Sequence, residues 1–80
     1  MRRRTKRNIQ LYGWTRDVLV IVDSLNKAKF SLSEVYESEE ELAKMHPANR
    51  HVREKIRQQL QVLRDVGILE FLGRGQYRIS

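Results

Sequence analysis

The sequence predicts a mainly helical α+β domain, and three observations support that fold class. Residues 49–67, NRHVREKIRQQLQVLRDVG, repeat apolar residues at the spacing of an α-helix. Two earlier apolar segments each follow a residue that is suited to capping a helix. The last residues, ILEFLGRGQYRIS, have the pattern of two strands around a glycine turn. Eighty residues are enough for one domain with a single small core.

The first helix is expected at about residues 15–26. Thr15 is its predicted N-cap, and the apolar residues that follow recur at helical spacing. Trp14, just before this helix, is expected to anchor the edge of the core rather than to stack on a base. After the helix, Phe30 and Ser31 are expected to form a short extended piece. The core face of the helix consists of Val18, Leu19, Val22 and Leu25.

The second helix is expected at about residues 32–45. Ser31 and Glu34 have the spacing of a capping box, in which each residue satisfies a backbone N–H of the other. A break in this helix is expected near residues 37–38. Pro47 ends it, because proline cannot continue a helical hydrogen-bond ladder.

The third helix has the clearest pattern in the chain. Asn49 is its predicted N-cap, and Gly67 is its predicted C′ residue. Gln59 falls on the core side of this helix, and a buried amide must find hydrogen-bond partners. We expect that partner to be the backbone of a neighbouring turn. The apolar stripe consists of Val52, Ile56, Leu60 and Leu63.

A β-hairpin is expected after the third helix, with strands at residues 68–72 and 76–79 and a Gly-Arg-Gly turn between them. Phe30, Phe71 and Tyr77 are expected to point into the core. The order of elements is helix, short strand, helix, helix, strand, strand. This order predicts a winged helix-turn-helix, with three helices plus a C-terminal β-hairpin wing.

Charge is distributed unevenly along the chain, which carries a net charge of +6. Residues 33–46 carry a net charge of −4, and residues 49–64 carry +4. Residues 1–10 begin with MRRRTKR and are interpreted as a basic arm or linker remnant, followed by a winged-helix DNA-binding domain at residues 11–80. A basic face of this kind favours a polyanionic partner.

Composition excludes several other classes of protein. The chain has no cysteine, so disulfides and thiolate metal sites are excluded. No apolar run approaches the length of a membrane span, and the basic start lacks the apolar segment of a signal peptide. We therefore expect a cytoplasmic protein that does not contact a membrane.

The open face of the third helix is the candidate DNA-reading surface. In a helix-turn-helix the second helix of the motif enters the major groove, where arginine pairs with guanine and glutamine with adenine. A solvated face rich in these residue types is the competing interpretation. The predicted base-reading residues are Arg50, Arg53, Glu54, Arg57, Gln58 and Gln61. The predicted DNA-backbone contacts are Asn49, His51, Lys55, Arg64, Arg74 and Arg78.

Simpler roles remain open for some of these residues. Asn49 has a sufficient role as a helix cap, and His51 could cover the helix start instead of donating to a phosphate. Arg74 could be a solubilising turn residue. Glu41 and Lys44 have the spacing of an intrahelical ion pair.

The sequence shows no constellation for catalysis, metal binding or a cofactor. His46 and His51 have no companion cysteine and no helical cluster of ligands. There is no Gly-rich phosphate loop, no Ser/His/Asp set and no Glu-x-Lys spacing of a metal-dependent nuclease strand. We therefore expect no enzyme activity and no cofactor.

Residues 11–79 resemble the C-terminal winged-helix domain of DpnI-like restriction endonucleases, the type IIM enzymes that cut adenine-methylated DNA. The segments HPANRH, KIRQQLQVLRD and EFLGRGQYR carry this resemblance and are more specific than a general helix-turn-helix pattern. In that family a nuclease domain precedes the winged helix, and both parts recognise N6-methyladenine, typically in a GATC context.

The resemblance implies that this chain is a non-catalytic, monomeric reader of adenine-methylated double-stranded DNA in a bacterial-type cytoplasm. The nuclease domain would be its partner in the full-length natural protein. N6-methylation places a methyl group in the major groove, where apolar carbon of a side chain can contact it. The aliphatic stems of Arg57, Gln58 and Gln61 are the candidates for that contact.

Two other functions are compatible with the same residues. One is a winged helix that binds DNA without regard to methylation, as in a transcriptional regulator. The other is a protein-interaction winged helix that docks through the acidic face of residues 33–46. The basic face of the third helix argues against the second alternative.

Overall fold

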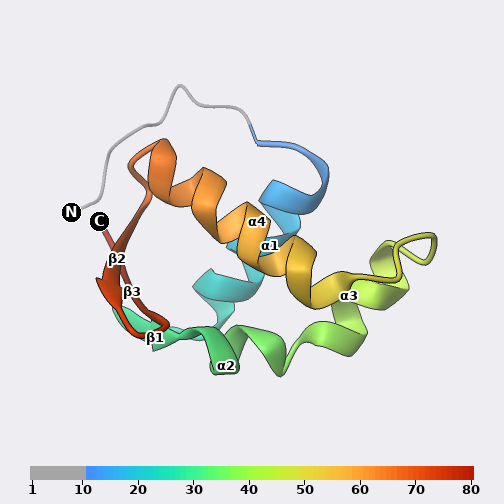
Figure 1. Cartoon of the computed structure of the whole chain (residues 1–80), viewed down its shortest axis with the longest axis horizontal. Coiled ribbons are helices and arrows are strands. Elements are labelled where there is room, and N and C mark those ends of the chain that lie inside the picture. Colours follow the sequence, from blue (N-terminus) through green and yellow to red (C-terminus); the bar gives the residue numbers. More distant parts are fainter. Residues whose placement is uncertain (1–10) are drawn as a thin grey trace.

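Seven elements build the domain in the computed structural model, which describes residues 11–80 (Figure 1). The predicted basic arm at residues 1–10 lies outside the described residues. The fold is the mainly helical α+β winged helix-turn-helix that the sequence predicts. The elements are α1 (Gly13–Ser24), β1 (Lys29–Ser31), α2 (Leu32–Tyr36), α3 (Glu39–Met45), α4 (Val52–Asp65), β2 (Leu69–Gly73) and β3 (Gln76–Ile79).

Helix α1 begins earlier than its sequence pattern indicates. Tyr12 is its N-cap residue, so the prediction that Thr15 caps this helix is wrong. Thr15 lies inside α1, and its hydroxyl donates a hydrogen bond to Oε1 of Gln59 in α4. Threonine is suited to a helix cap, but the Thr15 side chain instead forms a hydrogen bond between α1 and α4.

The predicted second helix forms as two short helices, and the expected break is confirmed. Oγ of Ser31 accepts from the backbone N–H of Glu34 at 3.3 Å, and Oε1 of Glu34 accepts from the backbone N–H of Ser31 at 2.8 Å. This capping box starts α2. Hydrogen bonds from Lys27 and from the Ser31 backbone lower the pKa of the Glu34 carboxyl. After a turn at Glu37 and Ser38, α3 continues the chain.

The N-terminus of α4 differs from the prediction. His51 is its N-cap residue, so Asn49 does not cap the helix. Instead, Oδ1 of Asn49 accepts a hydrogen bond from the backbone N–H of His51 at 2.7 Å. This bond forms an Asx-turn just before the helix. The residues before Val52 therefore form a loop, and Arg50 belongs to this loop rather than to the helix.

The C-terminus of α4 confirms the predicted role of Gly67, whose φ is +88°. The backbone N–H of Gly67 donates to Arg64 at 3.0 Å, and that of Ile68 donates to Leu63 at 2.9 Å. These two bonds make a Schellman motif, which satisfies carbonyls left over at the end of the helix. The motif also reverses the chain into β2.

The hairpin pairs with β1 to give a three-stranded antiparallel sheet in the order β1-β3-β2. Phe30, Tyr77 and Phe71 are directly opposed across the three strands and so share one face. Phe30 is 1% exposed, Tyr77 is half-buried and Phe71 is 43% exposed. The inward prediction for Phe71 is therefore wrong, because this residue lies on the edge strand, nearer the hairpin tip than buried Leu69.

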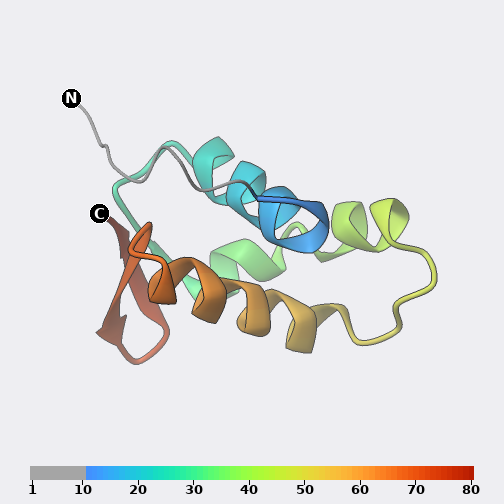
Figure 2. The same ribbon diagram turned by 90° about the horizontal axis from the view of Figure 1, so that it is seen from above.

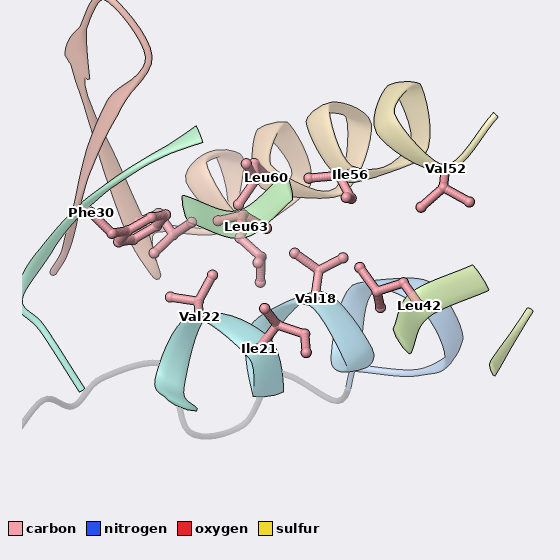
Figure 3. Close-up of a cluster of buried hydrophobic side chains, with 11 residues drawn as sticks. Val18, Ile21, Val22, Phe30, Leu42, Val52, Ile56, Leu60 and Leu63 are labelled. Carbon is pink, nitrogen blue, oxygen red and sulfur yellow. The ribbon is translucent and has the colours of Figure 1, made fainter. Parts of the chain in front are cut away.

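The core lies between α1 and α4, and Figure 3 shows the two helices pointing their apolar side chains at each other. Truncating one of these buried leucines to alanine costs about 2–5 kcal/mol in typical cores. The predicted stripe of α4 is entirely buried. The buried apolar residues are Val18, Ile21, Val22, Phe30, Val35, Leu42, Val52, Ile56, Leu60, Leu63 and Leu69.

Replacing Gly67 with alanine tests the helix stop. We expect Gly67→Ala to lower the free energy of unfolding by about 1 kcal/mol, because an L side chain is strained at positive φ. That change would lower Tm by about 4–8 °C in a domain of this size. The control is Gly67→Asn, which tolerates this conformation better and should lose less stability. Equal losses in the two variants would contradict the conformational explanation.

Candidate nucleic-acid interface

The outer face of α4 and the tip of the β2–β3 hairpin lie on the same side of the molecule. Figure 2 shows them together, with α1 and α3 on the opposite side. The 14 residues of α4 give it a length of about 21 Å at 1.5 Å per residue. A helix is about 10–12 Å across, and the major groove is about 12 Å wide. The dimensions of α4 therefore suit insertion into the groove.

An open pocket of about 400 Å³ lies at the N-terminal end of α4. It joins three predicted contacts in the preceding loop, Asn49, Arg50 and His51, with residues on the first two turns of the helix. The backbone N–H groups of a helix start favour negative charge. The lining residues are Ala48, Asn49, Arg50, His51, Glu54, Lys55 and Gln58.

The loop before α4 is fastened to α1 through His46. Nε2 of His46 lies 2.6 Å from Oδ2 of Asp17, and its ring stacks on Trp14 with ring centres 4.1 Å apart. Trp14 packs against the core as predicted. Together, Trp14 and Asp17 hold the start of the loop that carries Asn49 and Arg50.

Three arginines form the flank of α4 that faces α2 and the wing. Arg53, Arg57 and Arg64 are spaced by four and seven residues, which keeps them on one side of the helix. The guanidinium carbon of Arg53 lies 4.7 Å from the centre of the Tyr36 ring, and Nε of Arg53 lies 2.9 Å from Glu39. Sequence spacing does not predict this pairing of Arg53, a predicted base reader, with an acidic residue of α3.

Arg64 and Arg57 lie beside the wing. The guanidinium carbon of Arg64 is 5.6 Å from the centre of the Phe71 ring. Burial raises the pKa of the Tyr77 phenol, and the nearby cations Arg64 and Arg57 oppose that rise. Within residues 11–80, the Arg57 side chain has no hydrogen bond or ion pair. Arg57 is therefore available to a ligand without exchanging partners inside this region.

The middle of the outer face of α4 carries Glu54, Gln58 and Gln61, all exposed. Nε2 of Gln61 donates to Oδ1 of Asp65 at 3.1 Å, and Glu54 lies 4.0 Å from Nδ1 of His51. Lys55 is half-buried and lies on the flank opposite the arginines. The predicted residues on α4 therefore lie on its outer face and its two flanks, with donors and acceptors side by side.

Arg74 forms the tip of the wing, in a two-residue turn with Gly75. Both residues have positive φ, +51° for Arg74 and +73° for Gly75, as a type I′ hairpin turn requires. The carbonyl of Gly75 accepts the backbone N–H of Leu32 at 2.8 Å, which ties the tip to the start of α2. Arg78 is less available, because its Nη2 lies 2.5 Å from Oε1 of Glu70 on the neighbouring strand.

Gln59 is buried as predicted, but the expected partner is wrong. Its amide accepts from the hydroxyl of Thr15 and donates to Oε1 of Gln58 at 3.2 Å, so both partners are side chains rather than a backbone turn. The position of Gln59 on the core stripe was the signal in the sequence. The sequence could not identify Thr15 as a partner, because that requires knowing which turn of α1 crosses α4.

Residues 11–80 show neither a metal-binding cluster nor a membrane-spanning helix. No group of three or more His, Cys, Asp or Glu side chains in this region is arranged to hold a metal ion. No helix in the same region is long and apolar enough to cross a lipid bilayer.

The fold and this surface agree with a comparison to protein families. The sequence model of the Dam-replacing HTH domain family, a C-terminal domain of DpnI-like proteins, matches residues 10–79. The chain belongs to this family. It is a helix-turn-helix DNA-binding domain, and the resemblance drawn from its sequence is confirmed. In this DNA-binding domain, α4 is the second helix of the motif and the β2–β3 hairpin is the wing.

Replacing Arg74 tests the wing. We expect Arg74→Asn to weaken binding to all DNA sequences alike, because a phosphate contact carries no sequence information. The slope of log affinity against log salt should become shallower by about 0.9 for one lost phosphate contact. Stability should be kept, because asparagine tolerates positive φ.

The matched control for Arg74→Asn is Arg16→Ala. Arg16 is exposed on α1, on the side away from buried Val18 and Val22. It should leave both affinity and salt slope unchanged. A wild-type salt slope in Arg74→Asn would remove the wing from the interface.

Proposed function

We propose that this domain reads double-stranded DNA that contains N6-methyladenine in a GATC context. Helix α4 enters the major groove, and bases are read through Arg50 of the preceding loop and, on the helix, through Arg53, Glu54, Arg57, Gln58 and Gln61. The DNA backbone is held by Asn49, His51, Lys55, Arg64, Arg74 and Arg78. The domain acts as a monomer and supplies specificity, without catalysis, to the nuclease domain of a methyl-directed restriction endonuclease.

The observation that carries this proposal is the outer face of α4 in a member of this family. Arg57 has no hydrogen bond or ion pair within residues 11–80, and Gln58 and Gln61 are exposed beside it. These residue types match purine edges in the major groove. The name of the Dam-replacing family and the resemblance to DpnI-like enzymes support adenine methylation as the mark that is read.

A methyl group supplies only a modest part of the discrimination. Burying one methyl or methylene group is worth about 0.8 kcal/mol, which is about a fourfold change in affinity. The stems of Arg57, Gln58 and Gln61 provide carbon for that contact. Two methyl groups, one on each strand, give about fifteenfold if their contributions add. Full methylation is therefore the form that this domain distinguishes best.

The two alternative functions would use different contacts. A methylation-independent regulator would use α4 and the wing identically but gain nothing from the methyl groups. A protein-interaction module would dock through α3, where Glu40 and Glu41 are exposed and Glu39 already pairs with Arg53. Neither alternative makes use of a methyl contact on α4.

Binding to three otherwise identical GATC duplexes tests the proposal. At physiological salt we expect affinity to rise about fourfold on methylation of one strand and about fifteenfold on methylation of both. Physiological salt is needed because phosphate contacts alone can hide specificity at low salt. Equal affinity for all three duplexes would favour the regulator, and no binding at low salt would favour the protein-interaction module.

Replacing Arg57 tests the placement of α4. We expect Arg57→Ala to lose about 1–3 kcal/mol of discrimination between cognate and non-cognate duplexes, because a bidentate contact to a base is lost. The free energy of unfolding should change little, since Arg57 is exposed and unpaired within residues 11–80. Arg16→Ala is again the control. Wild-type discrimination in Arg57→Ala would show that α4 is placed wrongly.

A further inference from the structure

Gln59 is the one polar residue of the described chain, residues 11–80, that is buried, with 6% of its surface exposed. Its neighbours on the buried stripe of α4 are Ile56, Leu60 and Leu63. A leucine at this position would fill the core with no polar group to satisfy. A buried amide is costly unless it is hydrogen-bonded, so the partners of Gln59 decide what it does in the fold.

The hydrogen bonds of Gln59 form a relay that runs from α1 to the surface of α4. Thr15 uses its single hydroxyl proton to donate to Oε1 of Gln59. With its oxygen occupied as an acceptor, Gln59 presents its NH₂ group outward, and Nε2 donates to Oε1 of Gln58 at 3.2 Å. The relay thus ends on an exposed side chain that lines the pocket at the start of α4.

The relay determines which end of the Gln58 amide faces a ligand. A glutamine amide carries an acceptor oxygen and a donor NH₂ group. The oxygen of Gln58 already accepts from Gln59, and its NH₂ group makes no hydrogen bond within residues 11–80. A ligand that meets Gln58 therefore meets a donor that is held in one orientation.

We propose that Gln59 is a positioning residue that fixes Gln58 as a hydrogen-bond donor toward DNA and thereby sets its preference among adenine forms. This inference rests on the proposed function. A freely rotating glutamine recognises adenine by accepting from N6 and donating to N7. In a duplex, N6-methyladenine keeps its one N6 hydrogen in the base pair, and the methyl group stands in the major groove. The unrestrained contact would therefore favour unmethylated adenine.

Holding the oxygen of Gln58 removes that unwanted preference. Gln58 held in this way directs its NH₂ group at acceptors in the major groove, such as N7 of a purine, O6 of guanine or O4 of thymine. Its oxygen is turned toward Gln59 and away from the base edge, so it does not face the methyl group. The relay therefore lowers the affinity for unmethylated adenine instead of adding a contact to the methylated form.

The orientation of the relay is measurable in the wild-type protein without DNA. Side-chain NH₂ exchange with water, measured by NMR, should be slow for Gln59 and fast for Gln58. Gln76, which is exposed and has no side-chain hydrogen bond within residues 11–80, is the internal reference. Exchange of Gln58 that is slowed relative to Gln76 would mean that the relay runs in the reverse direction, which would overturn the proposal.

The consequence for specificity is tested with the double variant Thr15→Val/Gln59→Leu. Removing both partners together leaves no buried group unpaired, so the fold should be kept, which thermal unfolding verifies. Released from the relay, Gln58 can turn its oxygen toward the base edge. We expect affinity for the unmethylated GATC duplex to rise about fivefold, the lower end of what a bidentate contact contributes, with affinity for the fully methylated duplex unchanged.

Comparing the unmethylated and fully methylated duplexes distinguishes a positioning role of Gln59 from a purely structural one. A distorted α4 would weaken binding to both duplexes, whereas the relay predicts a gain on the unmethylated duplex alone. Adding Gln58→Ala to the double variant should abolish that gain. If wild type prefers the methylated duplex and the double variant has the same ratio, only the relay is wrong. If wild type has no preference, the proposed function fails, and the relay fails with it.

Discussion

The packing of α1 against α4 is the constraint on which the rest of the structure depends. Burying Ile56 and Leu60 against Val18 and Val22 fixes the rotation of α4 about its own axis. At 100° per residue, that rotation turns the exposed Arg57, Gln58 and Gln61 away from the core. The loop before α4 is tied to α1 through His46, and the wing follows from the Schellman motif at the end of α4. Apolar contacts therefore orient α4, and hydrogen bonds at its two ends position the loop and the wing.

Two of the arginines proposed to contact DNA form ion pairs in the free domain, and breaking these pairs costs little free energy. Arg53 and Arg78 are paired with Glu39 and Glu70 in the free domain, so a phosphate or base must replace a carboxylate at these two positions. Exposed ion pairs are worth about 0–1 kcal/mol, which makes that exchange inexpensive. Arg57, Arg50 and Arg74 have no such partner within residues 11–80, and these three arginines carry the first attraction to DNA in this account.

Much of the fold was predictable from sequence because local chemistry determines it. The stripe of α4, the capping box of Ser31 and Glu34, and the stop at Gly67 all depend on residues close together in the chain. The errors concern contacts between distant segments. Thr15 and Asn49 have the residue types of helix caps, but Thr15 bonds across to Gln59 and Asn49 closes a turn before His51. Phe71 follows the inward pattern of its strand but lies on the edge strand of the sheet, where its side chain stays exposed.

The candidate site divides in the same way. Its members on α4 follow from helical periodicity, whereas the partners of Arg53 and Arg78 required the arrangement of α3 and the sheet. The most direct test of the account is a backbone amide NMR titration of the wild-type domain with the fully methylated GATC duplex. We expect the largest shift changes at residues 49–64 and 74–78, with little change at Asp23 and Val20 on the exposed side of α1. Changes centred on α1 or α3 instead would contradict the placement of α4 in the DNA groove.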